Sequence, residues 1–379
     1  MKPTPCVALH ELGQSVWLDN INDGLIQSGE LARLIAEGSV YGVTSNPTIF
    51  KNAIAGDQFT YPTEIARLAN MGKSPAEIFD ELAFRDISRT ADLLADTFRR
   101  GSGRDGFVSL EVAPALSGDT AATVAEAKRL WKLVQRPNLF VKVPGTPQGI
   151  PAIEELIADG VSINVTLIFS RPQYTAVAAA YRRGIERRIK AGLPLDALHS
   201  VASVFVSRLD TSVDKELETR AAAAPDAAAR ERYLTLRGAA AVANALDIWE
   251  EYRSQFFGAV FGPLRSKGAR PQWVLWASTG TKNPAYSDVR YVTELIGPDV
   301  INTMPEHTLQ AFAGHGTVAR TVDASPDDAQ RMLAAAAASG VDLAAVTAQL
   351  EREGVSSFCD SYHQLLACIE HKLAAGAAR

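Results

Sequence analysis

The stretch that decides the fold is Asn138-Leu-Phe-Val-Lys-Val-Pro-Gly-Thr146. Residues 139–143 form an apolar run between Pro137 and Pro144-Gly145, and this pattern predicts a short strand. A strand that is apolar on both faces is typical of a parallel sheet covered on both sides. Lys142 lies in the middle of this run. A lysine in a buried strand must be paired, neutral or reactive, because an unpaired buried charge is costly.

Lys142 can be interpreted in two ways. An isolated lysine at a strand end most often reaches solvent or binds a phosphate. Alternatively, burial lowers the pKa of the ammonium group, and the neutral amine then attacks a carbonyl carbon to form a Schiff base. The residues on the neighbouring strands decide between these two interpretations.

The composition sets the class of protein. The chain has 379 residues, of which 47% are hydrophobic and 21% charged, with a formal net charge of -5. This is typical of a soluble globular protein and argues against a general nucleic-acid or anionic-membrane surface. Cys6, Cys359 and Cys368 have neither metal-ligand spacing nor a disulfide pattern, which indicates a reducing compartment. No signal-peptide pattern is present and no apolar stretch approaches the ~20 residues of a membrane helix, so we expect a cytoplasmic protein.

Eight short apolar segments alternate with helical segments along the chain. This alternation predicts a parallel sheet, and eight such units favour a closed (β/α)8 TIM barrel with additional helices. An open doubly wound sheet is the alternative, but neither GxGxxG after a strand nor GxxxxGK[ST] is present to support it. The predicted strands cover residues 15–20, 41–47, 107–112, 139–143, 161–169, 200–206, 272–278 and 299–304.

We expect a single domain over residues 1–379, with barrel strands at about 15–304 and a helical C-terminal extension at 305–379. Residues 214–257 are predicted to form two or three helices, and Ser325-Pro326 begins a helix of the extension. The last helix should pack on the barrel through one apolar face. That face carries Phe358, Tyr362, Leu365, Ile369 and Leu373.

Polar side chains recur near the C-terminal ends of the predicted strands, where the active sites of such barrels lie. Because strand side chains alternate, Lys142 should point into the barrel while its valine neighbours face the helices. A buried Lys142–Glu111 ion pair is the structural alternative, although such pairs are weak evidence for stability. The inward-facing set comprises Asp19, Thr44, Asn46, Ser109, Glu111, Lys142, Asn164, Thr166 and Ser203.

These residue types fit Schiff-base chemistry. Lys142 supplies the amine, and Glu111 and Asp19 are the two candidate acid/base groups. Four further side chains can hydrogen-bond the hydroxyl groups of a sugar, namely Thr44, Asn46, Asn164 and Thr166. Arg208 and the segment Ser278 to Lys282 follow strands six and seven, and they suit a phosphate group.

The sequence resembles a transaldolase of the longer bacterial type, within the class I Schiff-base aldolases. As a set and in this order, the matching motifs are highly specific, and they run from near the N-terminus to about Gly316, with a weaker match from Gly354 to Phe358. The motifs are Val16-Trp-Leu-Asp-Asn20, Gln27-Ser-Gly-Glu-Leu31, Gly42-Val-Thr-Ser-Asn-Pro-Thr-Ile-Phe50, Val108-Ser-Leu-Glu-Val112, Val141-Lys-Val-Pro-Gly-Thr146, Ile163-Asn-Val-Thr-Leu-Ile-Phe-Ser170, Ser203-Val-Phe-Val-Ser-Arg-Leu-Asp210, Trp276-Ala-Ser-Thr-Gly-Thr-Lys-Asn283 and Asn302-Thr-Met-Pro305.

The resemblance implies a TIM barrel without metal or organic cofactor, acting in the non-oxidative pentose phosphate pathway. The expected reaction transfers dihydroxyacetone from fructose 6-phosphate or sedoheptulose 7-phosphate to erythrose 4-phosphate or glyceraldehyde 3-phosphate. By the motifs, Lys142 forms the Schiff base, Asp19 is the base for retro-aldol cleavage, and Glu111 with Thr166 and a water handles imine formation. The same motifs place Asn46 and Asn164 on the donor's hydroxyls, and Ser203, Arg208, Ser278 and Lys282 around its hydroxyl and phosphate end.

One segment departs from the family pattern. Shorter relatives have Ser-Phe-Arg-Asn after strand seven, whereas this chain reads Ser278-Thr-Gly-Thr-Lys-Asn283, with lysine at the charged position. Lysine offers a point charge in place of the arginine fork.

Three alternative functions remain at the sequence level. One is a class I aldolase that releases free dihydroxyacetone, and another is a non-catalytic sugar-phosphate-binding barrel. A metal-dependent aldolase is disfavoured, because the six histidines are scattered without HxxxH or HExxH spacing. The sequence does not distinguish a monomer from a homodimer.

Overall fold

The computed structural model describes residues 3–323 and 326–377. Its eight parallel strands form a closed barrel in sequence order, and β8 completes the circle by pairing with β1. The predicted (β/α)8 fold is therefore confirmed and the open doubly wound alternative is wrong. The strands are β1 (Gln14–Leu18), β2 (Gly42–Val43), β3 (Val108–Glu111), β4 (Leu139–Pro144), β5 (Ile163–Ile168), β6 (Ser200–Phe205), β7 (Trp273–Ala277) and β8 (Val300–Met304).

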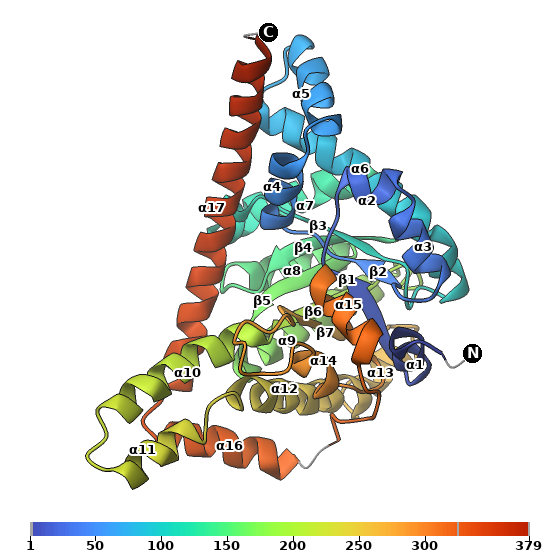
Figure 1. The fold of residues 1–379 in the computed structure, drawn as a ribbon. Coiled ribbons are helices and arrows are strands. Elements are labelled where there is room, and N and C mark those ends of the chain that lie inside the picture. The colour runs from blue at the N-terminus through green and yellow to red at the C-terminus, as the bar shows by residue number, and fades with distance from the viewer. Residues whose placement is uncertain (1–2, 324–325, 378–379) are drawn as a thin grey trace.

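Helices connect the strands and extend beyond the barrel (Figure 1). Between β1 and β5 they are α2 (Asp23–Gln27), α3 (Glu30–Ala36), α4 (Pro47–Gly56), α5 (Thr60–Asn70), α6 (Pro75–Arg100), the 3-10 helix η1 (Pro114–Gly118), α7 (Thr120–Val134) and α8 (Gly149–Asp159), with α1 (Pro5–Glu11) ahead of β1. After β5 they are α9 (Arg171–Lys190), α10 (Ser207–Ala222), α11 (Ala227–Leu234), α12 (Ala240–Phe257), α13 (Gly262–Arg265), α14 (Arg290–Thr293), α15 (Glu306–His315), α16 (Pro326–Ala338) and α17 (Leu343–Ala377).

Two helices of the first half of the barrel begin at polar capping residues. Ser74 and Glu77 form the reciprocal capping box of α6, with Pro75 at its first position. Asp119 caps α7 by accepting a hydrogen bond from the Ala122 amide. Both helices, α6 and α7, therefore satisfy part of their first backbone N–H groups locally.

Strand β4 has the predicted character, because all six of its residues are buried. The register places Glu111 of β3 beside Lys142, and Lys142 beside Asn164 of β5. Three polar residues from adjacent strands therefore lie at one level of the barrel. This level is set by backbone pairing, and it does not depend on the side chains themselves.

Several predicted bounds differ from the structure. Strand β2 contains only Gly42 and Val43. The Thr44 amide still donates to the Leu18 carbonyl of β1, and the chain then turns into α4, which Asn46 caps. The helices after β6 begin at Ser207, earlier than the predicted residue 214, so Arg208 lies in the first turn of α10. Three helices, α10 to α12, cover the predicted helical region. The N-terminal helix α1 was not predicted, although Thr4 caps it and Pro5 occupies its first turn.

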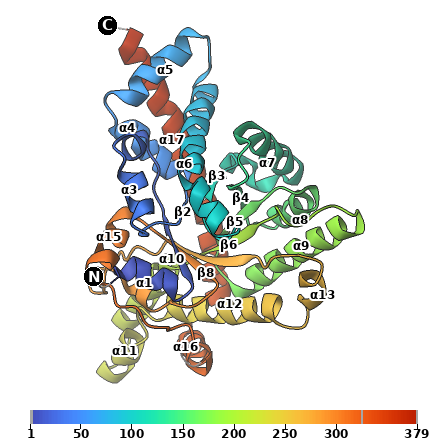
Figure 2. The same ribbon diagram turned by 90° about the vertical axis from the view of Figure 1, so that its right-hand side faces the viewer.

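The long helix α17 runs along the barrel from α10 to α5 (Figures 1 and 2), packing against α4, α5, α6 and α10. Its predicted apolar face is confirmed, since Phe358, Leu365 and Ile369 are buried and Tyr362 and Leu373 are partly buried. Helix α16 begins at Pro326, whereas Ser325, its predicted start, lies outside the described residues.

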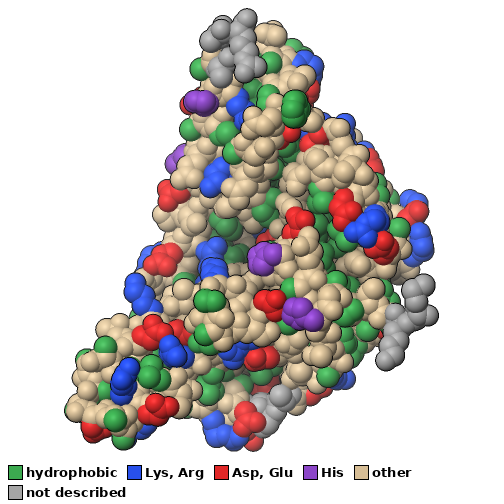
Figure 3. Space-filling model, in the orientation of Figure 1, with side chains coloured by type: hydrophobic (Ala, Val, Ile, Leu, Met, Phe, Trp, Pro, Cys, Tyr) green, Lys and Arg blue, Asp and Glu red, His purple; other side chains and the backbone are tan. Residues whose placement is uncertain are grey.

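Two surface properties accompany this fold. Acidic and basic side chains are interspersed on the face shown in Figure 3. Within the described residues, no single helix is both long and apolar enough to cross a membrane. The pair α16 and α17 reaches that length and apolarity only together, with a bend of 93° between them.

An aromatic layer fills the barrel below the level of Lys142. Trp17 of β1 and Phe140 of β4 precede Asp19 and Lys142 by two residues, and their rings stack with centroids 6.2 Å apart. Phe107 stacks on Phe140 at 4.1 Å. Gly42 of β2 provides the space for this layer, because a Cβ atom at this position would lie 2.4 Å from Cε2 of Trp17. The layer supports the polar level above it.

We predict that Gly42→Ala destabilises the protein by about 1–3 kcal/mol, because the added methyl group forces the Trp17 ring to move. Urea unfolding followed by circular dichroism measures this change. Gly56→Ala is the matched control, since a Cβ atom at Gly56 meets no atom within 4 Å. Equal stability of the two variants would contradict the close packing of Gly42 on Trp17.

Candidate active site

A cavity of about 410 Å³ opens at the C-terminal ends of the barrel strands. Lys142 lies inside it, and its side chain is only 6% exposed. Nine of the eleven predicted site residues line this cavity: Asp19, Thr44, Asn46, Lys142, Thr166, Ser203, Arg208, Ser278 and Lys282. The structure thus brings together side chains from six different strand ends.

The Lys142 amine has two polar neighbours in the described chain. Its Nζ atom donates a hydrogen bond of 3.0 Å to the backbone carbonyl of Ser45, and it lies 3.5 Å from Oε2 of Glu111. Both Lys142 and Glu111 have buried side chains, so this ion pair is shielded from bulk water. The same contact fits the structural alternative of a buried ion pair, which the surrounding groups must therefore distinguish.

Glu111 pairs with Lys142 in the β3–β4 register but does not line the main cavity itself. Burial raises the pKa of its carboxyl group, although the charge of Lys142 opposes this shift. Apart from the Lys142 amine at 3.5 Å, its Oε2 atom has no hydrogen-bond partner in the described residues. A carboxyl group with a raised pKa and spare hydrogen-bonding capacity is suited to hold and transfer a proton.

Thr166 presents an unsatisfied group. Its Oγ1 atom is buried without a hydrogen-bond partner in the described chain, and its side chain lines the cavity. The β5–β6 register shifts between Val165 and Ile168, and Leu167 has a positive φ of 61°. Such irregularities occur near active sites, where they redirect a side chain. The site therefore offers oxygens of Glu111 and Thr166 as partners for a water or a substrate hydroxyl.

Asp19 follows β1 and continues the barrel pairing, since its amide donates to the Met304 carbonyl at 2.8 Å. Thr44 donates a 2.6 Å hydrogen bond to Oδ1 of Asp19 and lies 2.6 Å from the hydroxyl of Thr303. Burial raises the pKa of Asp19, while the Lys142 charge and the Thr44 hydrogen bond lower it. Asp19 is thus a carboxylate held in place by a hydroxyl chain and electrostatically coupled to Lys142.

The two predicted asparagines have different surroundings. Asn46 lines the cavity, but its Oδ1 caps α4 by accepting from the Ile49 amide at 3.0 Å. Only its Nδ2 group is therefore available to a ligand. Asn164 does not line the cavity, because its oxygen accepts from Ser203 at 2.6 Å and its Nδ2 donates to Ser109 at 3.2 Å. In this structure Asn164 orients Ser203, which does line the cavity.

The cationic end of the cavity contains Arg208 and Lys282. Neither has an ion-pair partner among the residues that the structure describes. Burial lowers the pKa of both groups, and the Arg208 charge lowers that of Lys282 further. The charge of Glu353 only partly offsets the effect of burial on the pKa of Arg208. Two partly desolvated cations that form no ion pair in the described residues favour an anionic ligand such as a phosphate. Lys282 therefore reaches the cavity despite the longer segment after β7.

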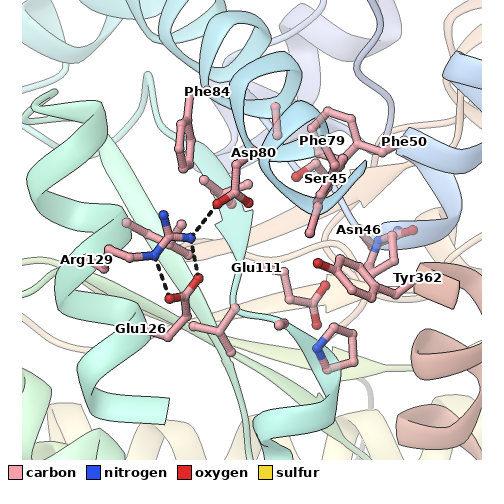
Figure 4. Close-up of a pocket in the computed structure, with 18 of the residues that line it drawn as sticks. Ser45, Asn46, Phe50, Phe79, Asp80, Phe84, Glu111, Glu126, Arg129 and Tyr362 are labelled. Atoms are coloured by element: carbon pink, nitrogen blue, oxygen red, sulfur yellow. Dashed lines mark hydrogen bonds and ion pairs between the residues drawn. The ribbon is translucent and has the colours of Figure 1, made fainter. Parts of the chain in front are cut away.

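A second cavity of about 160 Å³ adjoins Glu111 and Asn46 (Figure 4). Phe50, Phe79, Phe84 and Tyr362 contribute aromatic walls, and the figure shows Arg129 held between Asp80 and Glu126. Glu111 therefore lines this second cavity, while its Oε2 atom lies 3.5 Å from the Lys142 amine of the main cavity.

Several residues of the main cavity were not predicted as site residues from the sequence. They include Thr303 of β8, His307 of α15, Phe205 of β6 and Phe358 of α17. Thr303 belongs to the motif that ends β8, which was a usable signal. His307 and Phe358 come from helices whose position over the strand ends is a tertiary property. In the described part of the chain, no three His, Cys, Asp or Glu side chains form a group suited to a metal ion.

Comparison with known proteins agrees with the chemistry that the geometry of the site suggests. The family described as Transaldolase/Fructose-6-phosphate aldolase matches residues 16–369. This chain belongs to that family. A transaldolase of Thiobacillus denitrificans is 48% identical over 358 residues, which cover 94% of this chain and 97% of that protein.

Two further relatives extend the likeness over nearly the whole length. A transaldolase of Mycolicibacterium paratuberculosis is 46% identical over 361 residues, covering 95% of this chain and 94% of that protein. A transaldolase of Thermobifida fusca is 46% identical over 374 residues, covering 98% of this chain and 99% of that protein. The similarity to transaldolases therefore extends over both the barrel and the C-terminal helices.

Proposed function

We propose that this member of the transaldolase family transfers a dihydroxyacetone unit between sugar phosphates through a Schiff base on Lys142. One observation carries the proposal. In a chain of this family, the buried Lys142 amine lies 3.5 Å from Glu111 and shares a cavity with Asp19. The relatives named transaldolase support transfer as the reaction, in place of simple release of dihydroxyacetone.

The first half of the reaction forms the imine. The neutral Lys142 amine attacks C2 of the ketose phosphate, which gives a carbinolamine. Loss of the C2 hydroxyl as water needs a proton donor, and Glu111 has the raised pKa that keeps a proton available. Thr166 holds the departing water, since its buried hydroxyl has no other partner in the described residues. The backbone carbonyl of Ser45 orients the lysine nitrogen during these steps.

The second half breaks and re-forms the carbon–carbon bond. Asp19 takes the proton from the C4 hydroxyl, the C3–C4 bond breaks, and its electron pair enters the enamine while the aldose phosphate leaves. The acceptor aldehyde then binds, the enamine carbon attacks it, and Asp19 returns the proton to the new hydroxyl. Hydrolysis of the imine releases the product ketose and the free Lys142 amine.

Binding and orientation fall to the remaining residues of the cavity. The Nδ2 group of Asn46 and the Ser203 hydroxyl hold the donor's hydroxyls, and Asn164 positions Ser203. Arg208, Ser278 and Lys282 receive the phosphate at the cationic end of the cavity. Fructose 6-phosphate and sedoheptulose 7-phosphate share this hydroxyl pattern and terminal phosphate, so both are suitable donors.

The proposal predicts that Lys142→Arg lowers the transfer rate by at least about a thousandfold, because a guanidinium group supplies no neutral amine. The assay follows sedoheptulose 7-phosphate formed from fructose 6-phosphate and erythrose 4-phosphate. Lys51→Arg is the control, since Lys51 is away from the cavity lining. Wild-type activity in Lys142→Arg would contradict the Schiff base, and dihydroxyacetone release without heptulose formation would identify an aldolase.

A further prediction separates the two carboxylates. With fructose 6-phosphate labelled with ¹⁸O at C2, imine formation exchanges the label into water. Asp19→Ala should keep this enzyme-dependent exchange but lose C3–C4 cleavage, because Asp19 acts only after the imine has formed. Glu111→Gln should lose both, because the amide cannot supply a proton for dehydration. Asp288→Ala, which changes an exposed carboxylate, is the control, and loss of exchange in Asp19→Ala would contradict the assigned order.

A further inference from the structure

The backbone is strained immediately after Thr166. Leu167 of β5 has a φ of 61°, in the left-handed region that residues other than glycine rarely adopt. The β5–β6 register shifts in the same place, between Val165 and Ile168. A strained backbone of this kind persists only where the contacts around it hold it in place. The residues that hold Leu167 therefore also determine how Thr166 is presented to the main cavity.

The side chain of Gln173, in the first turn of α9, contacts this strained segment twice. Its Nε2 group donates a 2.9 Å hydrogen bond to the Leu167 carbonyl, and its Oε1 atom accepts a 2.9 Å hydrogen bond from the Phe169 amide. The cap of α9 fixes the position of Gln173, because the Gln173 amide donates to the Ser170 hydroxyl. Two backbone polar groups of the irregular segment are thus satisfied by one side chain.

The same side chain links β5 to the end of β4, the strand that carries Lys142. The Nε2 group of Gln173 also donates a 2.9 Å hydrogen bond to the Gly145 carbonyl. The Gly145 amide in turn donates to the Thr166 carbonyl at 2.7 Å. Gln173 therefore holds the backbone on the Leu167 side of Thr166 directly, and it holds the Thr166 carbonyl through Gly145.

The C-terminal helix packs on the outside of this arrangement. Helix α17 passes beside β5 (Figure 1), and Oε2 of Glu351 accepts a 3.2 Å hydrogen bond from Nε2 of Gln173. A Cβ atom at Gly354 would lie 2.8 Å from Cδ2 of Leu167, so the helix lies directly on the strained residue. With three acceptors around Nε2, both N–H groups of Gln173 are used within the protein. Gln173 does not line the main cavity, so it affects the reaction only through the residues that it holds.

We propose that Gln173 is a positioning residue for imine formation, and that it acts by directing the Thr166 hydroxyl into the cavity of Lys142. This inference rests on the proposed function, in which Thr166 holds the water that leaves the carbinolamine. The Thr166 hydroxyl has no hydrogen-bond partner in the described residues, so its direction depends on the backbone. Without the Gln173 hydrogen bonds the Leu167 backbone relaxes, and the Thr166 hydroxyl turns away from the water.

The test is a double-mutant cycle between Gln173→Met and Thr166→Val. Methionine resembles glutamine in size but donates no hydrogen bond, and valine removes only the threonine hydroxyl. The measurement is the enzyme-dependent exchange of ¹⁸O from C2 of labelled fructose 6-phosphate into water. Each single variant should slow this exchange by about tenfold or more. The double variant should match Thr166→Val within about twofold, because a residue that acts through Thr166 has no effect once the hydroxyl is gone.

Asn138→Leu is the matched control for lost hydrogen bonds. Asn138 also donates from one amide group to two backbone carbonyls, those of Ala91 and Gly106, at the opposite end of β4. Its substitution lowers stability without touching Thr166, so exchange should stay within about twofold of wild type. Gln173→Glu is a second variant that also lacks the donor, and it should slow exchange as Gln173→Met does. Circular dichroism confirms that each variant is folded at the assay temperature.

The outcomes separate this inference from the proposed function. Wild-type exchange in folded Gln173→Met or Gln173→Glu would overturn the positioning role alone. So would a double variant whose loss equals the product of the two single losses, because Gln173 would then act independently of the Thr166 hydroxyl. Wild-type exchange in Thr166→Val would instead contradict the role of Thr166 in the proposed function, and the inference with it.

Discussion

The structure depends on one constraint, which is the burial of a lysine amine inside a closed barrel. The Lys142 side chain is 6% exposed and its Nζ atom lies 3.5 Å from Glu111. Ionic groups at such a position are expensive unless charge and hydrogen bonds compensate for lost hydration. Here the compensation is incomplete, because Oε2 of Glu111 has only the Lys142 amine at 3.5 Å and Oγ1 of Thr166 has no hydrogen-bond partner in the described chain. A purely structural ion pair needs no open hydroxyl beside it, whereas a site that binds a substrate hydroxyl or water uses one.

Barrel closure converts separate strand ends into one site. Backbone pairing places Glu111, Lys142 and Asn164 at one level, and the closing pair β8–β1 brings Thr303 to Thr44 and hence to Asp19. The aromatic layer of Trp17 and Phe140 lies two residues below Asp19 and Lys142 on the same strands. The polar level therefore rests on a rigid apolar one, which fixes the catalytic side chains without using loops.

Local patterns in the sequence predicted most of this arrangement. Alternation along β4 predicted the inward direction of Lys142, which lines the cavity, and the count of alternating strands and helices predicted the closed barrel. The resemblance to transaldolases, confirmed by the family match and by the relatives, supplied the expected roles. The catalytic roles of individual side chains remain proposals, because the structure gives the positions of these side chains and not the steps of the reaction.

The remaining features depend on contacts between distant segments. The hydroxyl of Thr303 and the ring of His307 reach the cavity only because β8 pairs with β1 and α15 lies over the strand ends. Asn164 was predicted to bind a substrate hydroxyl, yet its side chain is hydrogen-bonded to Ser109 and Ser203. The alternation of side chains along one strand cannot reveal such contacts between strands. Likewise, α10 begins at Ser207, so Arg208 lies in its first turn and lines the same cavity as Lys282.

The most direct test of the central claim is reductive trapping of the intermediate. The protein is incubated with fructose 6-phosphate and sodium borohydride, digested, and its peptides are mapped by mass spectrometry. The account predicts a dihydroxyacetone-derived adduct on Lys142 and on no other lysine. An adduct on a different lysine, or none under conditions of active turnover, would contradict it.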